Sequence, residues 1–252
     1  MPRFFIALSF NGKNYVGWQI QPNGMSVQQM LQEALSTILR SEIEVVGAGR
    51  TDAGVHAHKM FAHFDWEGEA FSHSDLIHKL NNFLPKDISI HNIQKVKPDA
   101  HARFSAVLRK YKYYVTTLKD PFMHELTHRV YFTPDIDRMN ALCEIIKDYD
   151  DFGSFSKSNT DVKTNICNIV SAEWVREGDM FVFTIVADRF LRNMVRAIVG
   201  TLLEGGRGRL DERGMHRIIQ SKNRQMAGDS APGHALYLED VIYPDDIWLS
   251  DN

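Results

Sequence analysis

The sequence predicts an α+β fold of two ferredoxin-like halves, which form a mostly antiparallel central sheet flanked by helices. The first observation is the order of the predicted elements, because each half is predicted to contain a strand, a helix, further strands, a second helix and a final strand. The second is size, because 252 residues can bury a sizeable core and suit one or two domains. The third is composition, because 44% hydrophobic and 24% charged residues are typical of a globular protein. We predict an N-terminal half over residues 1–105 and a C-terminal half over residues 106–252.

The N-terminal half begins with an apolar, partly β-branched run over residues 4–10, which indicates a strand ended by Asn11-Gly12. Ser26 is predicted to cap a helix, because Gln29 follows three residues later as in a capping box. The apolar residues of that helix recur at helical spacing: Val27, Met30, Leu31, Ala34, Leu35, Ile38 and Leu39. The remaining predicted elements are strands over 42–46, 59–66 and 88–96 and a helix over 74–83.

The C-terminal half repeats this order without a clear sequence repeat. The pattern predicts a strand over 106–118, a helix over 135–148 and a hairpin whose turn is Glu177-Gly178-Asp179. The hairpin strands are expected over 164–176 and 180–187. An apolar run over 190–203 indicates a helix, which Gly205-Gly206 should end. A helix over 211–220 and a strand over 236–243 complete this half.

Charge is unevenly distributed in a chain whose net charge is −3. Residues 101–112 contain no acidic residue but include Arg103, Arg109, Lys110 and Lys112. Residues 189–217 contain seven arginines against three acidic residues. Such clustering favours a basic face for a polyanion, although an ordinary solvated surface would give the same pattern.

Two further features bear on location. The longest apolar run is far shorter than the ~18 residues that span a bilayer, so no membrane partner is expected. Cys143 and Cys167 are too few and too isolated for a disulfide framework or a C-x-x-C site. The sequence therefore favours a cytoplasmic protein.

Residues 47–57 place reactive side chains among glycines and alanines. Asp52 lies between Thr51 and Ala53, with Arg50 two residues before it and His56 four residues after it. Glycine permits tight turns and a close approach of backbone to ligand, so Asp52 is a candidate nucleophile or base on a loop. The spacing matches neither G-x-G-x-x-G nor G-K-[ST], which disfavours a phosphate loop. A plain turn with a hydrogen bond from Asp52 is the structural alternative.

Two other segments carry candidate binding residues. In a strand over 109–114, Tyr111 and Tyr113 share one face, whereas Lys110 and Lys112 share the other. Basic residues beside aromatic ones suit RNA, although tyrosines that fill a core and solvated lysines would give the same pattern. Arg196 lies on the apolar helix predicted over 190–203, four residues after Arg192. An anionic partner, a surface acid or solvent could each explain it.

A metal site is disfavoured. His56, His58 and His63 do not match a zinc hydrolase motif, and neither cysteine lies near them in the sequence.

Six blocks of the sequence resemble the tRNA pseudouridine synthase A (TruA) family. The most specific runs unbroken from Gly49 to His56 and reads G-R-T-D-A-G-V-H. The others lie, in order, over residues 15–21, 101–106, 109–114, 194–196 and 236–238. The sequence differs from the family at Met60, where glutamine is common, at Ala235, where glycine is common, and before Met194, where histidine is common.

The resemblance implies an enzyme that isomerises uridine to pseudouridine at positions 38, 39 and 40 of the tRNA anticodon stem-loop, without cofactor or metal. It implies an active-site cleft between the two halves, a flipped-out target nucleotide and a homodimer. Asp52 would be the catalytic carboxylate, with Arg196 as its cationic partner. The residues implied in substrate binding are Tyr111, Arg50, Arg103, Arg196 and Leu236.

Two other classes of function are compatible with the residues themselves. One is a non-catalytic RNA-binding module, and the other is a hydrolase that uses Asp52 and His56 as an acid–base pair.

Overall fold

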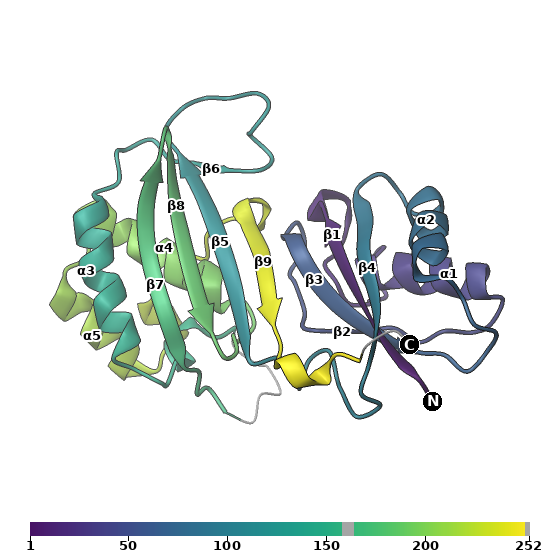
Figure 1. Cartoon of the computed structure of the whole chain (residues 1–252). Helices are drawn as coiled ribbons and strands as arrows, with labels where there is room; N and C mark the ends of the chain where they lie inside the picture. Colours follow the sequence, from purple (N-terminus) through teal and green to yellow (C-terminus); the bar gives the residue numbers. More distant parts are fainter. Residues whose placement is uncertain (158–163, 250–252) are drawn as a thin grey trace. The chain divides into compact units, whose positions relative to one another are not determined.

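The computed structural model describes residues 1–157 and 164–249. Within these residues the chain forms five α-helices and nine β-strands that pair mostly antiparallel (Figure 1), so the predicted α+β class is confirmed. The chain divides into two compact units. Unit 1 comprises Met1–Val107 and Leu238–Asn252, and unit 2 comprises Leu108–Tyr237. The sequence placed a boundary between residues 105 and 106 and did not foresee that the chain returns to the first unit.

Unit 1 is built on a sheet with β1 (Arg3–Phe10) near its centre. β1 pairs antiparallel with β3 (His56–Asp65) on one side and with β4 (Ile88–Val96) on the other. The two-residue strand β2 (Val46–Gly47) pairs with the far edge of β3. β9 (Leu236–Ile242), which belongs to unit 1 from Leu238 onward, also neighbours β3. The helix α2 (His73–Phe83) packs on β4 and against α1 (Val27–Leu39).

The helix α1 begins where its capping signal predicts. The backbone N–H of Gln29 donates to the Ser26 hydroxyl at 3.2 Å, which satisfies one of the first free N–H groups of the helix. The buried residues Val27, Leu31, Ala34 and Leu35 form its inner face. The apolar period and the cap together explain why this helix could be located from sequence.

The strand predicted over residues 42–46 is wrong except at its last residue. The backbone of Val45 bonds instead to two side chains of α1. Its carbonyl accepts from the Gln28 amide at 2.7 Å, and its N–H donates to the Gln32 side-chain oxygen at 3.2 Å. Ile43 likewise donates to the Ser36 hydroxyl at 3.0 Å. These apolar residues are buried, but their backbone groups are satisfied by a helix rather than by a neighbouring strand.

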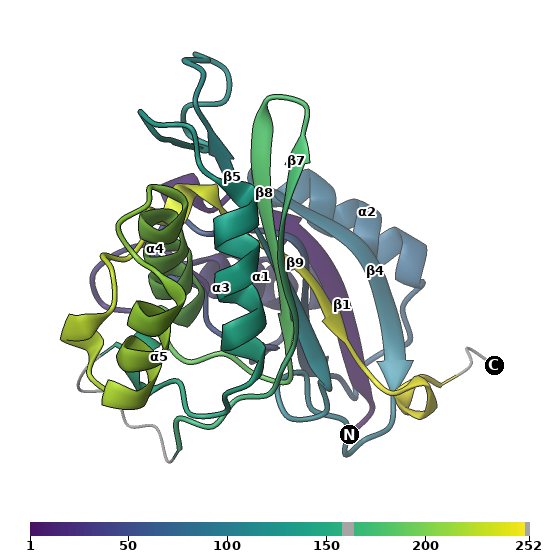
Figure 2. The same ribbon diagram turned by 90° about the vertical axis from the view of Figure 1, so that its left-hand side faces the viewer.

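Unit 2 has three main strands and three helices on one face of them (Figure 2). β8 (Met180–Ala187) lies between β5 (Leu108–Thr116) and β7 (Ile169–Glu177), antiparallel to both. The short β6 (His128–Arg129) runs parallel to β5. The helix α3 (Ile136–Lys147) packs on β7, on α4 (Met194–Gly206) and on α5 (Glu212–Ser221).

The buried rings of Tyr113, Phe183 and Trp174 stand in one row across the unit 2 sheet. Tyr113 is the register partner of Phe183, and Phe183 is the partner of Trp174. All three side chains are fully buried. This row shows which face of β5 points into the core.

The helix predicted over residues 190–203 is wrong at both ends. It starts at Met194 because Asn193 has a left-handed backbone with φ of 66°. Gly205 and Gly206 lie inside the helix, where an added Cβ would collide with the side chains of Leu142 and Met139 in α3. These glycines therefore allow two helices to pack closely, and α4 ends at the second of them, three residues later than predicted.

Candidate active site

Asp52 lies on a tight loop between β2 and β3 in unit 1. The loop is anchored where the N–H of Ala48 donates to the carbonyl of Phe61 at 2.8 Å. It turns where the N–H of Val55 donates to the carbonyl of Asp52 at 3.2 Å and Gly54 takes a left-handed φ of 76°. Thr51 and Val55 are buried, whereas the Asp52 side chain is half-buried. The backbone thus fixes the loop and leaves the carboxylate partly accessible.

Two glycines outside the G-R-T-D-A-G-V-H motif approach the backbone of this loop closely. A Cβ at Gly12 would collide with the carbonyl of Val55, and a Cβ at Gly17 would collide with the carbonyl of Thr51. Gly17 also has a left-handed φ of 111°, which favours glycine for a second reason. Gly17 lies in the family-like block over residues 15–21, but no pattern in the sequence indicated that either glycine contacts the Asp52 loop.

His56 is part of the same packing. Its ring is 2% exposed, and its Nδ1 accepts the backbone N–H of Gly12 at 3.0 Å. One ring nitrogen is therefore committed to the fold. This role disfavours the hydrolase alternative, in which His56 would exchange protons with a substrate.

Arg103, also in unit 1, extends from a turn closed by its neighbours. The N–H of Ser105 donates to the carbonyl of His101, and the N–H of His101 donates to the Ser105 hydroxyl, both at 2.9 Å. The side chains of Arg103 and Phe104 are exposed, with the guanidinium carbon 5.5 Å from the Phe104 ring centroid. Arg50 is exposed as well, on the Asp52 loop.

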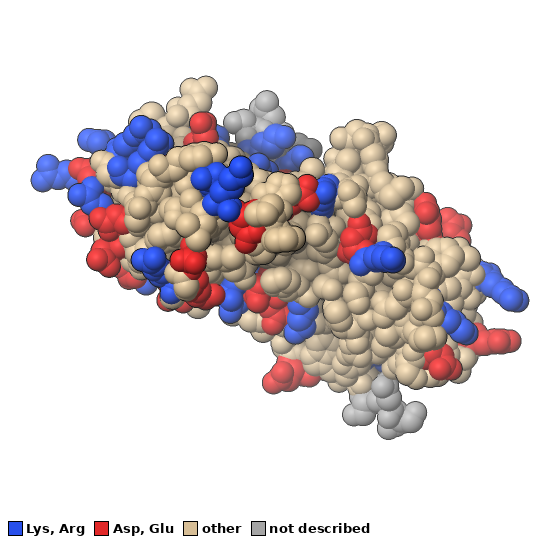
Figure 3. Space-filling model, turned by 90° about the horizontal axis from the view of Figure 1, so that it is seen from above, with Lys and Arg blue, Asp and Glu red and all other residues tan. Residues whose placement is uncertain are grey.

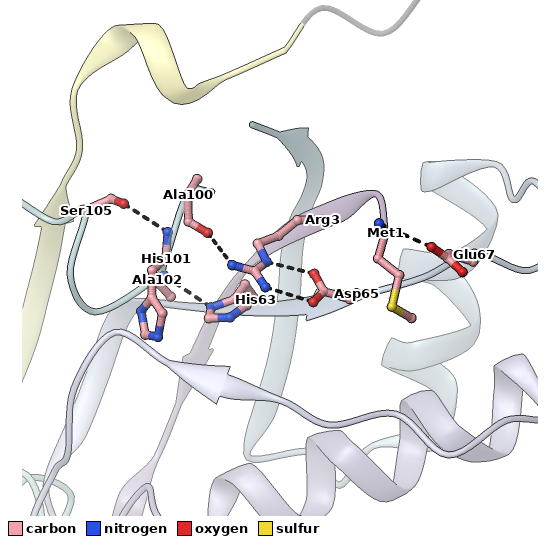
Figure 4. Close-up of polar contacts among 9 residues, drawn as sticks. All are labelled: Met1, Arg3, His63, Asp65, Glu67, Ala100, His101, Ala102 and Ser105. Atoms are coloured by element: carbon pink, nitrogen blue, oxygen red, sulfur yellow. Dashed lines mark hydrogen bonds and ion pairs between the residues drawn. The ribbon is translucent and has the colours of Figure 1, made fainter. Parts of the chain in front are cut away.

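An ion pair and a buried histidine support this turn (Figure 4). Arg3 contacts Asp65 through two donors at 2.7 and 2.8 Å and donates to the carbonyl of Ala100 at 2.9 Å. The hydrogen bonds from Arg3 lower the pKa of Asp65. His63 accepts the N–H of Ala102 at 3.1 Å. Burial, and then the charge of Arg3, lower the pKa of His63 to about 4, so the ring is neutral and remains an acceptor at neutral pH.

We expect this histidine to make the protein less stable in mild acid. Below its ordinary pKa of 6.5 the unfolded chain binds a proton that the folded chain excludes, so stability falls as pH drops from about 6.5 to about 4. The full loss is roughly 3 kcal/mol. The free energy of unfolding, measured with urea at about pH 7 and about pH 4, should therefore fall more in the native protein than in His63→Asn, by that amount. Asparagine keeps a hydrogen-bond acceptor but does not titrate. Equal losses would contradict the assignment.

The tyrosines of β5 lie as strand alternation predicts. Tyr111 is half-buried, and its ring meets Phe190 edge-on at 5.1 Å. Tyr113 is buried and donates its hydroxyl to the carbonyl of Pro232 at 2.9 Å, and burial raises its pKa. Tyr114, on the other face, meets Tyr237 edge-on at 5.1 Å. Tyr113 therefore fills the core, as one of the two interpretations of this strand predicted. Tyr111 is on the same face of β5 but is only half-buried, so part of its ring is accessible.

Arg196 is half-buried in the first turn of α4, in unit 2. Its Nε donates to the carbonyl of Ala231 at 2.7 Å, and the N–H of Ala231 donates back to the carbonyl of Arg196 at 3.0 Å. The same loop is bound to α4 where the N–H of Gly228 donates to the Thr201 hydroxyl at 2.9 Å. Leu236, buried at the start of β9, follows this loop. Sequence reasoning missed the loop over residues 224–232 that orients Arg196.

The basic residues do not all have the same surroundings. Arg109 donates to the carbonyl of Asp188 at 2.6 Å, and Arg189 donates to two backbone carbonyls at 3.4 Å. Lys110 and Lys112 lie on the face of β5 opposite Tyr113. Arg192 precedes α4, so it does not lie on the helix that carries Arg196, although the helix predicted over residues 190–203 included both. On the surface shown in Figure 3, basic and acidic side chains are interspersed.

Within residues 1–157 and 164–249, no group of three or more His, Cys, Asp or Glu side chains is arranged to hold a metal ion. Over the same residues, no helix is long and apolar enough to cross a bilayer.

The family model for tRNA pseudouridine synthase matches residues 6–105 and 149–244, which is more than half of the chain. The chain belongs to the tRNA pseudouridine synthase family. A tRNA pseudouridine synthase A from Parabacteroides distasonis is 59% identical over 98% of both chains. Proteins of the same name from Bacteroides thetaiotaomicron and Bacteroides fragilis are 57% and 56% identical, covering 100% and 98% of this chain and 94% and 98% of their own.

The match to the tRNA pseudouridine synthase family includes most of the predicted site residues. Asp52 and Arg103 lie in its first range, and Arg196 and Leu236 lie in its second. Tyr111 lies between the two ranges, so its assignment depends on the sequence block and on its place in β5. Met60 and Ala235, two positions at which the sequence departs from the pattern expected from the family resemblance, are fully buried, which makes them packing positions.

Proposed function

We propose that this protein converts uridine to pseudouridine in tRNA, at positions 38, 39 and 40 of the anticodon stem-loop, with Asp52 as the catalytic carboxylate. The observation that carries the proposal is the half-buried Asp52 carboxylate on a loop that Gly12 and Gly17 hold by close backbone contact. Its relatives are named tRNA pseudouridine synthase A and align along almost the whole chain.

The reaction is an isomerisation that balances without a redox step. The N1–C1′ bond of uridine breaks, the base turns, and C5 joins C1′. C5 loses a proton, and N1, which no longer carries the sugar, gains one. A carboxylate can serve this sequence by attacking C1′, by attacking C6 or by removing the proton from C2′.

A stacked base is out of reach of a side chain, so the target nucleotide has to flip out, at a cost of a few kcal/mol. We propose that Tyr111, Arg196 and Leu236 of unit 2 act on the same nucleotide as Asp52 of unit 1. The half-buried ring of Tyr111 beside Phe190 supports a stacking contact. The exposed cations of Arg50 and Arg103 support contacts with the RNA backbone.

The finer fold prediction is part of this proposal. Unit 1 follows the path β1-α1-β2-β3-α2-β4, with strands in the order β4-β1-β3-β2, which supports a ferredoxin-like half. In unit 2 the path β5-α3-β7-β8-α4, with strands in the order β5-β8-β7, supports a second one. Following the family resemblance, we also propose that the protein is cytoplasmic and forms a homodimer. Sedimentation of the purified protein would test the homodimer.

One assay separates the proposed enzyme from its two rivals. Unmodified tRNA is incubated with the protein, and pseudouridine, free uracil and strand breaks are mapped. We expect pseudouridine at positions 38–40 without free uracil. Free uracil or breaks would favour the hydrolase, and tight binding without a product would favour the RNA-binding module.

A polyanionic substrate also predicts a steep salt dependence. Each phosphate contact contributes about −0.7 to −0.9 to the slope of log affinity against log salt. If Lys110 and Lys112 each contact a phosphate, the double Lys→Gln variant should have a slope shallower by roughly 1.4 to 1.8. As a control we choose Lys97→Gln with Lys147→Gln, because these lysines pair with Asp246 at 2.7 Å and Glu144 at 2.6 Å. A tRNA affinity of the native protein that does not change with salt would rule out a polyanionic substrate. Equal slopes of log affinity against log salt in the two double variants would mean that Lys110 and Lys112 do not contact phosphates.

A further inference from the structure

We propose that Phe104 is a stacking platform for an unpaired base of the bound tRNA, separate from the target uridine. The inference rests on the proposed function and adds a contact to it. Phe104 is 74% exposed, yet its ring is not isolated. It lies 4.4 Å from the His101 ring at an interplanar angle of 41°, with the Arg103 guanidinium carbon 5.5 Å from its centroid.

The ring of Phe104 is the outer member of a column of three. His101, the middle ring, meets His63 edge-on at 4.7 Å. His63 is 5% exposed and lies on β3, where the Arg3–Asp65 ion pair adjoins it. Figure 4 shows His101 beside His63, with the ion pair next to them. Phe104 is thus supported by a column that begins in the core of unit 1.

The backbone under Phe104 is equally constrained. The N–H groups of three successive residues donate to imidazole nitrogens, Ala102 to His63 at 3.1 Å and then Arg103 and Phe104 to His101 at 3.0 and 3.4 Å. The carbonyl of Ala102 accepts the Tyr243 hydroxyl at 2.6 Å. Burial lowers the pKa of both histidines, so both rings can accept these bonds at neutral pH.

These constraints favour binding, because a ring held in place loses little conformational freedom when a partner stacks on it. A single exposed phenylalanine is ordinary on a protein surface. This one is fixed from below and flanked by a cation, which are the two elements that contact the base and the phosphate of unpaired RNA. The anticodon loop, which adjoins the proposed target positions, supplies unpaired bases.

The test compares Phe104→Ala with Phe122→Ala, since Phe122 of unit 2 is similarly exposed at 87%. Binding of unmodified tRNA is measured by fluorescence anisotropy in an Asp52→Asn background, so that bound RNA is not converted. Phe104→Ala should weaken the affinity roughly 5- to 150-fold, whereas Phe104→Trp and Phe122→Ala should stay near the parent value. Because the side chain is exposed, the thermal midpoint should be unchanged.

A second measurement reports stacking itself. Anticodon stem-loops carrying 2-aminopurine at one loop position at a time should show quenching at one position with the parent protein. That quenching should disappear with Phe104→Ala and persist with Phe122→Ala. A structural role for the ring would not produce this pattern.

The two proposals fail in different ways. If the native protein forms pseudouridine but Phe104→Ala binds tRNA as tightly as Phe122→Ala does, the stacking role is overturned and the proposed enzymatic function stands. Native protein that neither binds nor modifies tRNA would overturn both. A change of oligomeric state in Phe104→Ala at unchanged RNA affinity would make the ring a contact between protein copies and would also overturn the stacking role.

Discussion

Asp52→Asn is expected to abolish pseudouridine formation, lowering the single-turnover rate by at least about 10³-fold. The substitution keeps the shape of the side chain but removes its ability to act as nucleophile or base. It should leave the loop intact, because the loop is closed by the backbone carbonyl of Asp52, which accepts from Val55 at 3.2 Å. Affinity for tRNA and the thermal midpoint should therefore stay close to the native values.

The matched control is Asp179→Asn, an exposed aspartate in the turn between β7 and β8. This substitution makes the same change of charge on the surface of unit 2, and the variant protein should form pseudouridine at the native rate. Rates are measured with enzyme in excess over tRNA, so that product release does not limit them. Substantial pseudouridine formation by pure Asp52→Asn protein would remove the carboxylate from the mechanism.

Substitutions at Tyr111 should have the second largest effect. Phenylalanine keeps the ring and removes only the hydroxyl, whereas alanine removes both. If the hydroxyl moves a proton, for example from C5, Tyr111→Phe should lose about 10²-fold in the chemical step. If the ring only stacks, Tyr111→Phe should stay active and Tyr111→Ala should fail. We expect both functions, and hence a loss in each variant.

The neighbouring tyrosines provide the controls. Tyr113→Phe loses a buried hydrogen bond to Pro232 and should cost about 1 kcal/mol of stability with little effect on the rate. Tyr114→Phe should change neither. Single-turnover rates at saturating tRNA exclude effects on binding and release. A native rate for Tyr111→Ala would mean that this end of β5 is not part of the active site.

Local signals located most helices and strands. The cap at Ser26 and the apolar period after it gave the start of α1, and the alternation of β5 correctly separated Tyr113 from Tyr114. The same signals failed at residues 42–45, because apolar residues there bond through their backbone to Gln28 and Gln32 of α1. They also failed at Asn193, whose left-handed backbone starts α4 later than its apolar run.

The sequence by itself determined the candidate catalytic loop, because G-R-T-D-A-G-V-H is a contiguous motif that can be identified without knowing its surroundings. Only the tertiary structure showed what holds that loop and its neighbours. Gly12 and Gly17 meet it by close backbone contact, and His63 accepts from Ala102 far along the chain. Likewise, residues from Leu238 onward return to the first unit. Such contacts join residues distant in sequence, and their partners are chosen by packing and by hydrogen bonds that local periodicity does not encode.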